Sequence, residues 1–122
     1  MNVLLGLGGT DESIRALEET IERADDVGDD LVVATLDKPD APRTQAEMHD
    51  EAMATLESVD FDAEIRDLEG DPGPALVNLA EREGFDRIVI GGGTETPMGK
   101  IRLGPITEFV LLNASMPVTL IR

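Results

Sequence analysis

The sequence predicts an α/β protein, a Rossmann-like three-layer sandwich with helices on both faces of a five-stranded parallel sheet. Short apolar runs alternate along the chain with longer segments whose apolar residues recur at helical spacing. Most of the short runs are apolar at every position, which is typical of parallel strands buried on both faces. The length of 122 residues suits one domain, residues 1–122, around one aliphatic core.

The first predicted elements are a strand, a helix and a second strand. Val3 to Leu7 (VLLGL) is the first buried run. Thr10 is the expected N-cap of the helix, because its hydroxyl can accept a hydrogen bond from a free amide and two acids follow it at the positive end of the helix dipole. A polar turn is expected from Asp25 to Asp30, and Leu31 to Leu36 (LVVATL) is the second buried run.

The next segment contains a strand of different character. Two prolines between Lys38 and Arg43 predict a loop, and helical spacing runs from Thr44 to Val59. Phe61 to Leu68 (FDAEIRDL) alternates apolar and charged residues, so this strand has one wet face and belongs at a sheet edge. That placement favours the strand order 3-2-1-4-5, with a topological switch point between the first and fourth strands.

The C-terminal part completes the alternation of strands and helices. A helix is expected from Ala75 to Glu83, and Ile88 to Ile90 is the fourth buried strand. A glycine-rich loop from Gly91 to Gly104 follows it. A helix from about Pro105 to Ala114 and a last strand from Val118 to Arg122 end the fold.

Composition excludes several classes of function. The chain has no cysteine, which rules out disulfides, thiolate catalysis and cysteine-based metal sites. The net charge is −16 and no basic stripe exists, so nucleic acid is not an expected partner. No apolar run approaches the ~20 residues that cross a bilayer, so we expect a cytoplasmic protein without membrane contact. Many acids with only two lysines resemble the composition of halophilic cytosolic proteins.

Three stretches together resemble the universal stress protein family. They are VLLGLGGTDESIRALE, LEGDPGPALVNLAEREGFDRIVIGGG and LGPITEFVLLNASMPVTLI. The resemblance covers nearly the whole chain and implies an adenine nucleotide alpha hydrolase-like fold and a binding or regulatory role in the stress response. It also implies ATP or another adenine nucleotide as ligand, with Mg²⁺ bridging the phosphates only when a nucleotide is bound.

The nucleotide-binding branch of this family has a glycine pattern after the fourth strand. It reads Gly, two residues, Gly, nine residues, Gly, and then Ser or Thr; here the register gives Gly91, Thr94, Gly104 and Pro105. Thr94 carries a Cβ where the family brings bare backbone close to phosphate, and Pro105 has neither a hydroxyl nor an N–H. Gly8 stands where the family tends to carry an Asp. We therefore expect a degraded or altered nucleotide site.

If a nucleotide binds, the resemblance places its contacts at the ends of the first, second and fourth strands and at the start of the last helix. The expected residues are Gly6, Leu7, Gly8, Gly9, Thr35, Gly91, Thr94, Gly104 and Thr107. Lys100 and Arg102 form a local positive island beside them. Three interpretations stay open: a regulatory module with an altered site, an ATP-binding protein with slow hydrolysis, and an interaction module whose crevice is closed by Met98 and Leu103.

No residue constellation indicates turnover. His49 is the only histidine and no acid–base partner for it is evident in the sequence, so we expect it on the solvated surface. The serines lack a His-Asp arrangement, and the acid pairs lack the loop spacing of a calcium site. We therefore expect neither catalytic residues nor a metal site built by the protein.

The last strand predicts self-association. Pro117 to Arg122 is apolar and should lie at the second edge of the sheet, where unpaired backbone invites pairing. Antiparallel pairing with a second copy would cover it, and the resemblance implies the same arrangement. We expect a homodimer.

Overall fold

The computed structural model describes residues 1–122, except for the side chains of Thr94 and Glu95. The elements alternate along the chain as the apolar runs predict. Their order is β1 (Asn2–Leu7), α1 (Asp11–Val27), β2 (Asp30–Thr35), α2 (Gln45–Ser58), β3 (Glu64–Asp67), α3 (Pro72–Arg82), β4 (Arg87–Gly91), β5 (Thr94–Glu95), β6 (Ile101–Arg102), α4 (Pro105–Asn113) and β7 (Val118–Ile121).

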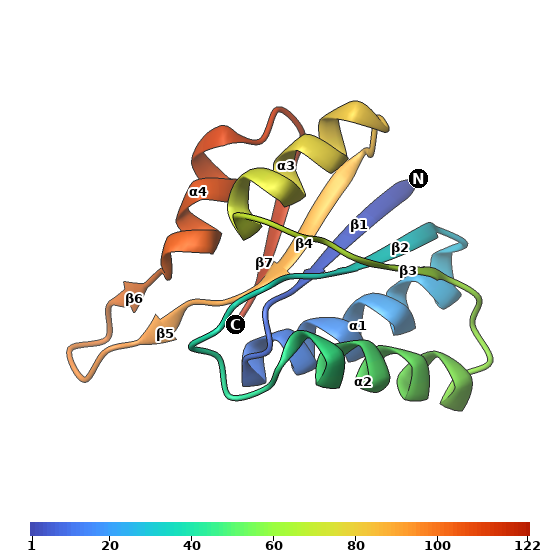
Figure 1. The fold of residues 1–122 in the computed structure, drawn as a ribbon, viewed down its shortest axis with the longest axis horizontal. Coiled ribbons are helices and arrows are strands. Elements are labelled where there is room, and N and C mark those ends of the chain that lie inside the picture. The colour runs from blue at the N-terminus through green and yellow to red at the C-terminus, as the bar shows by residue number, and fades with distance from the viewer.

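The main sheet has five parallel strands in the order β3-β2-β1-β4-β7 (Figure 1). This confirms the predicted order and the edge position of β3. The last strand is the seventh along the chain because the glycine loop contains a short antiparallel hairpin, β5–β6, that projects from the sandwich. The glycine-rich loop predicted between Gly91 and Gly104 thus contains two short strands that were not predicted from the sequence.

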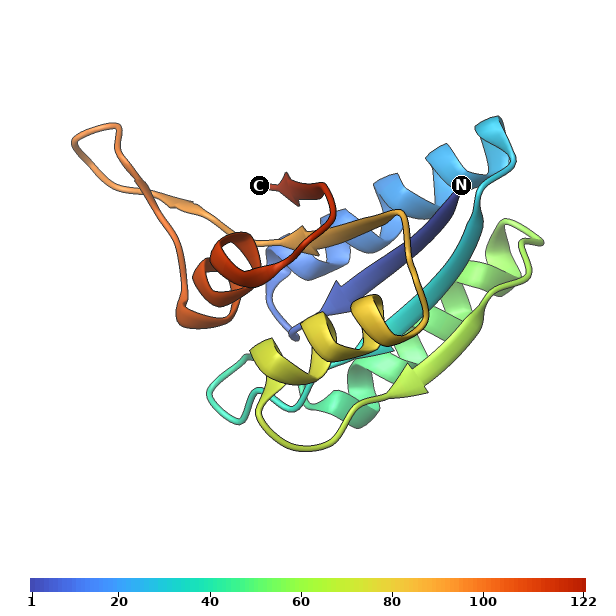
Figure 2. The same cartoon turned by 90° about the horizontal axis from the view of Figure 1, so that it is seen from above.

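Helices cover both faces of the sheet, as Figure 2 shows from above. On one face α1 and α2 pack over Leu5, Val33 and Val89, and on the other α3 and α4 pack over Leu4 and Ile88. Alternate residues of the same strand serve the two cores, because successive side chains of a strand point to opposite faces. This is the three-layer arrangement that continuous apolar runs predict.

Several element boundaries differ from the predictions. Helix α1 continues through Asp25 and Asp26, and the chain turns only at Gly28, whose φ of 77° ends the helix. Strand β3 omits Phe61, which packs on the core instead of pairing in the sheet. Helix α3 begins at Pro72, because a proline in the first turn has no amide that needs an intrahelical partner.

Among the described residues, no helix has both the length and the apolar character required to cross a membrane.

Candidate functional site

A crevice of about 200 Å³ opens beyond the carboxyl ends of β1 and β4, at the topological switch point of the sheet. Its walls come from the loop after β1 with the start of α1, from the end of β4, and from the start of α4. The crevice brings together four of the predicted site residues. They are Gly8, Gly91, Gly104 and Thr107.

In the wall at the start of α1, the polar groups already form hydrogen bonds with one another. Thr10 caps the helix by accepting from the Ser13 amide at 3.2 Å, and the Ser13 hydroxyl accepts from the Gly8 amide at 3.0 Å. Asp11 and Glu12 add negative charge in the first turn, where Asp11 pairs with Arg43 at 3.0 Å. This wall therefore offers few free donors to an anion.

The wall at the end of β4 is shaped by backbone packing. A Cβ on Gly91 would lie 2.6 Å from the Glu12 carbonyl carbon and 2.8 Å from the Ser13 nitrogen. A Cβ on Gly92 would lie 2.7 Å from the Thr107 hydroxyl oxygen. These two glycines let β4 approach α1 and α4 closely, which is a structural requirement independent of any ligand.

The wall at the start of α4 is open. Gly104 is the N-cap, has no side chain to cap the helix, and has no atom within 4 Å of the place where a Cβ would stand. Pro105 has no N–H, so the unpaired amides of the first turn are those of Ile106 and Thr107. Lys38 lines the same crevice, with its ammonium 3.1 Å from Asp40. The positive end of α4 and one lysine thus face the space.

Other predicted residues lie outside the crevice lining. Gly6 and Leu7 are buried in β1, and a Cβ on Gly6 would meet the Leu76 side chain at 2.7 Å. Gly9 packs against the Arg43 carbonyl with a φ of 84°. The backbone of Thr94 belongs to β5, but its side chain lies outside the described part of the structure, so its effect on a phosphate stays a prediction.

Thr35 belongs to a separate polar cluster at the carboxyl ends of β2 and β3, which was not found from the sequence. Its hydroxyl donates to Asp67 at 2.6 Å, and the Gln45 amide donates to the Thr35 carbonyl at 3.0 Å and to its hydroxyl at 3.1 Å. His49 Nδ1 lies 3.0 Å from Asp67, so the expectation that His49 has no acid–base partner was wrong.

The cluster has an electrostatic consequence for its carboxylate. The hydrogen bond from Thr35 and then the one with His49 lower the pKa of Asp67 below its ordinary value, while burial opposes the shift. Asp67 and His49 lie outside the crevice lining. The cluster therefore ties α2 to the edge of the sheet and adds no acid–base pair to the crevice.

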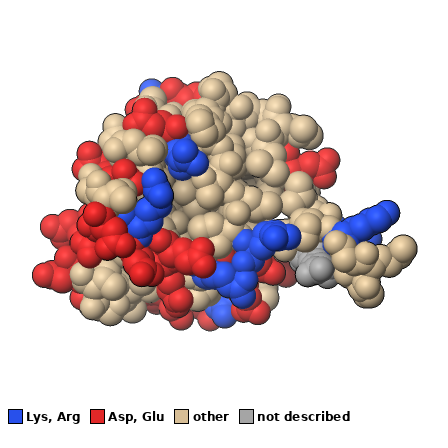
Figure 3. All heavy atoms as spheres, turned by 180° about the vertical axis from the view of Figure 1, so that it is seen from behind, with Lys and Arg blue, Asp and Glu red and all other residues tan. Residues whose placement is uncertain are grey.

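The basic residues of the glycine loop lie on the projecting hairpin. Lys100 and Arg102 are exposed, and neither lines the crevice. Figure 3 shows basic side chains on this hairpin, well apart from the acidic residues gathered at the opposite end of that view. Met98 is 84% exposed at the hairpin tip, so it does not close the crevice as the interaction-module interpretation required.

Among the described residues, no three His, Asp or Glu side chains form a group that could hold a metal ion. Glu12 is the only carboxylate among the described residues that line the crevice. The arrangement can receive a small anion at α4, and the described side chains that line the crevice include no pair of groups for acid–base chemistry.

Known proteins resemble this chain over different lengths. A universal stress protein from Archaeoglobus fulgidus superposes with a TM-score of 0.80 at 24% identity, covering 100% of this chain and 98% of that one. A universal stress protein solved in complex with cAMP gives a TM-score of 0.76 at 28% identity, covering 100% of this chain and 96% of that one.

Sequence relatives and the family model agree with this. Universal stress protein MJ0577 of Methanocaldococcus jannaschii is 34% identical over 67 residues, which cover 55% of this chain and 41% of that protein. Universal stress protein MJ0531 of the same organism is 38% identical over 55 residues, 45% of this chain and 32% of that protein. Each match spans less than half of the relative's length. The model of the universal stress protein family matches residues 1–122, and the chain belongs to that family.

Proposed function

We propose that this universal stress protein is a cytoplasmic regulatory module that binds an adenine nucleoside monophosphate in the crevice and does not turn it over. The observation that carries this is the open start of α4, where Gly104 leaves space and the first-turn residues Ile106 and Thr107 line the crevice beside Lys38. The similarity to a family member complexed with cAMP supports an adenine nucleotide carrying a single phosphate.

Size and donor supply favour one phosphate over three. Pockets for drug-sized ligands are usually 300–1,000 Å³, whereas this crevice measures about 200 Å³. Pro105 removes one amide from the first turn of α4, and the wall at α1 is capped by Thr10 and carries Glu12. Each further phosphate would add negative charge without adding a donor. The site is thus altered toward a smaller ligand.

The same lining supports the proposal that a bound nucleotide is not turned over. Hydrolysis of a nucleotide needs a group that orients or activates water, and among the described side chains that line the crevice the one carboxylate is that of Glu12, whose backbone packs against Gly91. His49, the single histidine, is held at Asp67 outside the crevice.

Calorimetric titration with AMP, cAMP and ATP in molar KCl tests the proposal. AMP or cAMP should bind at least about tenfold more tightly than ATP, and no phosphate should be released from ATP above a protein-free control. Thr107→Val should weaken AMP binding about tenfold by removing a hydroxyl from the crevice. Thr55→Val is the matched control, because its hydroxyl donates to the Glu51 carbonyl on α2. Tighter binding of ATP, or no binding of any nucleotide, would contradict the proposal.

We also propose that the functional unit is a homodimer through β7. The residues Val118–Ile121 are all half-buried at a sheet edge, and Leu112 on the preceding helix is 75% exposed. Pairing with a second copy would cover this edge. Light scattering in molar KCl should give twice the chain mass of 13.1 kDa, and a mass of 13.1 kDa would contradict it.

We further propose that the protein works in concentrated salt. With a net charge of −16, the acidic side chains repel one another and destabilise the folded chain. Molar salt screens this repulsion, because it shortens the Debye length to about 3 Å. The melting temperature should rise between low salt and molar KCl. An unchanged melting temperature would count against this.

A further inference from the structure

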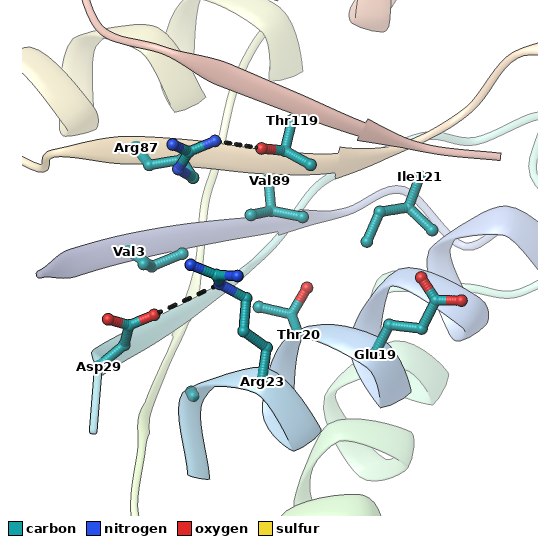
Figure 4. Close-up of a pocket in the computed structure, with 10 residues that line it drawn as sticks. Val3, Glu19, Thr20, Arg23, Asp29, Arg87, Val89, Thr119 and Ile121 are labelled. Carbon is teal, nitrogen blue, oxygen red and sulfur yellow. Dashed lines mark hydrogen bonds and ion pairs between the residues drawn. The ribbon is translucent and has the colours of Figure 1, made fainter. Parts of the chain in front are cut away.

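A second pocket, of about 420 Å³, lies between the C-terminal half of α1 and the strands β1, β4 and β7 (Figure 4). Its floor is apolar, with Val3, Val89 and Ile121 projecting from three different strands. Polar groups converge above this floor from both the helix and the sheet. The crevice lies at the first turn of the same helix, so the two sites occupy opposite ends of α1.

Arg87, the first residue of β4, places a cation in this pocket without a counter-charge. Its side chain is half-buried, and one terminal nitrogen donates to the Thr119 hydroxyl at 2.6 Å. Its Nε is buried and has no hydrogen-bond partner in the described structure. None of the ion pairs among the described residues involves Arg87. A buried donor of a charged group without an acceptor is costly, so this side of the pocket favours an anion.

Thr20 supplies a second, independent unpaired group. It is 5% exposed, and its hydroxyl oxygen is buried without a hydrogen-bond partner among the described residues. Figure 4 shows this hydroxyl directed from α1 toward the strands that carry Arg87 and Thr119. A hydroxyl in the interior of a helix usually bonds back to the helix or reaches solvent, and this one is turned into the pocket.

The two acidic side chains that line the pocket either form an ion pair already or lie at its rim. Asp29 is held by the N-terminal amine of Met1 at 3.2 Å and lies 3.9 Å from Arg23. Glu19 is exposed at the rim. These carboxylates disfavour a multiply charged anion but leave Arg87 free to take a single negative charge.

We propose that this pocket binds a small aliphatic carboxylate. The carboxylate pairs with the Arg87 guanidinium, and the Thr20 hydroxyl offers it a second donor from the helix side of the pocket. The aliphatic part lies on Val3, Val89 and Ile121. Inorganic phosphate would leave the apolar floor uncovered and would add charge near Asp29 and Glu19. The proposal is independent of nucleotide binding in the crevice.

NMR titration with isovalerate at constant ionic strength tests it, with inorganic phosphate and isoamyl alcohol as comparison compounds. Isovalerate should produce saturable shifts of the Thr20 and Thr119 amides. Phosphate and the alcohol should bind at least about tenfold more weakly, because phosphate lacks the aliphatic part and the alcohol lacks the carboxylate. AMP titrated into the same sample should leave these two amides unshifted.

Four variants separate binding from folding. Thr20→Val should weaken isovalerate binding about tenfold, whereas Thr20→Ser should bind within about twofold of the parent. Arg87→Lys keeps the charge but loses the planar donors, and should also weaken binding about tenfold. Arg82→Met, which removes an exposed arginine of α3 on the other face of the sheet, should bind as the parent does.

Circular dichroism in the same buffer checks that each variant is folded, and Arg87→Lys carries the test if Thr20→Val does not fold. Three outcomes would overturn the proposal. They are the absence of saturable shifts, phosphate or the alcohol binding as tightly as isovalerate, and Arg82→Met weakening binding as much as Arg87→Lys.

Discussion

Two of the three walls of the crevice, at the end of β4 and at the start of α4, use glycine for different physical reasons. At the end of β4, a Cβ on Gly91 would overlap the backbone of Glu12 and Ser13, so the fold itself excludes any larger residue. At the start of α4, Gly104 is surrounded by open space and has an ordinary φ of −74°. A glycine pattern that resembles a phosphate loop therefore contains positions set by packing. Only a glycine that packing does not require can indicate a ligand site.

The largest expected effect is that of Gly91→Ala on stability. The new Cβ would meet backbone atoms of the first turn of α1, which cannot move aside by a change of rotamer. The substitution should cost about 3 kcal/mol of unfolding free energy, at the upper end of overpacking effects. Urea unfolding in molar KCl measures it, and a cost below about 0.5 kcal/mol would show that β4 and α1 are not packed as described.

An intermediate effect is expected at Thr35, a predicted ligand residue that belongs to neither wall. Thr35→Val removes the hydroxyl that Asp67 and Gln45 share, at a position that is 0% exposed. The cost should be about 1–2 kcal/mol at neutral pH, with AMP affinity unchanged. A stable variant that no longer binds AMP would instead place Thr35 in the site.

The pH dependence of this variant sharpens the test. Because the folded pKa of Asp67 is lowered, its contribution to stability is present above the unfolded value of about 3.9 and is lost as the pH falls through the folded pKa. Thr35→Val should raise the folded pKa of Asp67. The stability difference between parent and variant should therefore shrink in acid, as equilibrium unfolding at a series of pH values would show. A difference that does not change with pH would mean that the hydroxyl acts on Gln45 alone.

The smallest expected effect on stability is that of Gly104→Ala. The new methyl group meets no atom within 4 Å, so the unfolding free energy should change by less than about 0.5 kcal/mol. AMP affinity should nevertheless fall, because the methyl group stands at the open start of α4. A large loss of stability with unchanged affinity would reverse the roles assigned to the two walls.

The fold could be predicted from the sequence because its signals are local. The apolar runs VLLGL and LVVATL mark β1 and β2, and the alternation in FDAEIRDL marks β3 as an edge strand. The hairpin β5–β6 could not be predicted, because each of its strands has only two residues and shows no periodicity.

The position of the crevice was predictable, but its detailed contacts were not. The switch point follows from strand order, and it locates Gly8, Gly91 and Gly104 at one crevice. The pairs Thr35–Asp67 and Arg87–Thr119 join residues 32 positions apart, and only the register of neighbouring strands brings them together. The spacing of residues along the sequence does not predict such pairs.

The hairpin β5–β6 leaves the sandwich at the end of β4 and returns at the start of α4, and its tip at Met98 stands in solvent. Residues inserted at this tip would leave the register of the sheet and both cores unchanged. The tip is therefore a suitable position for an inserted reporter, such as a fluorescent label, that would follow occupancy of the neighbouring crevice without disturbing the rest of the protein.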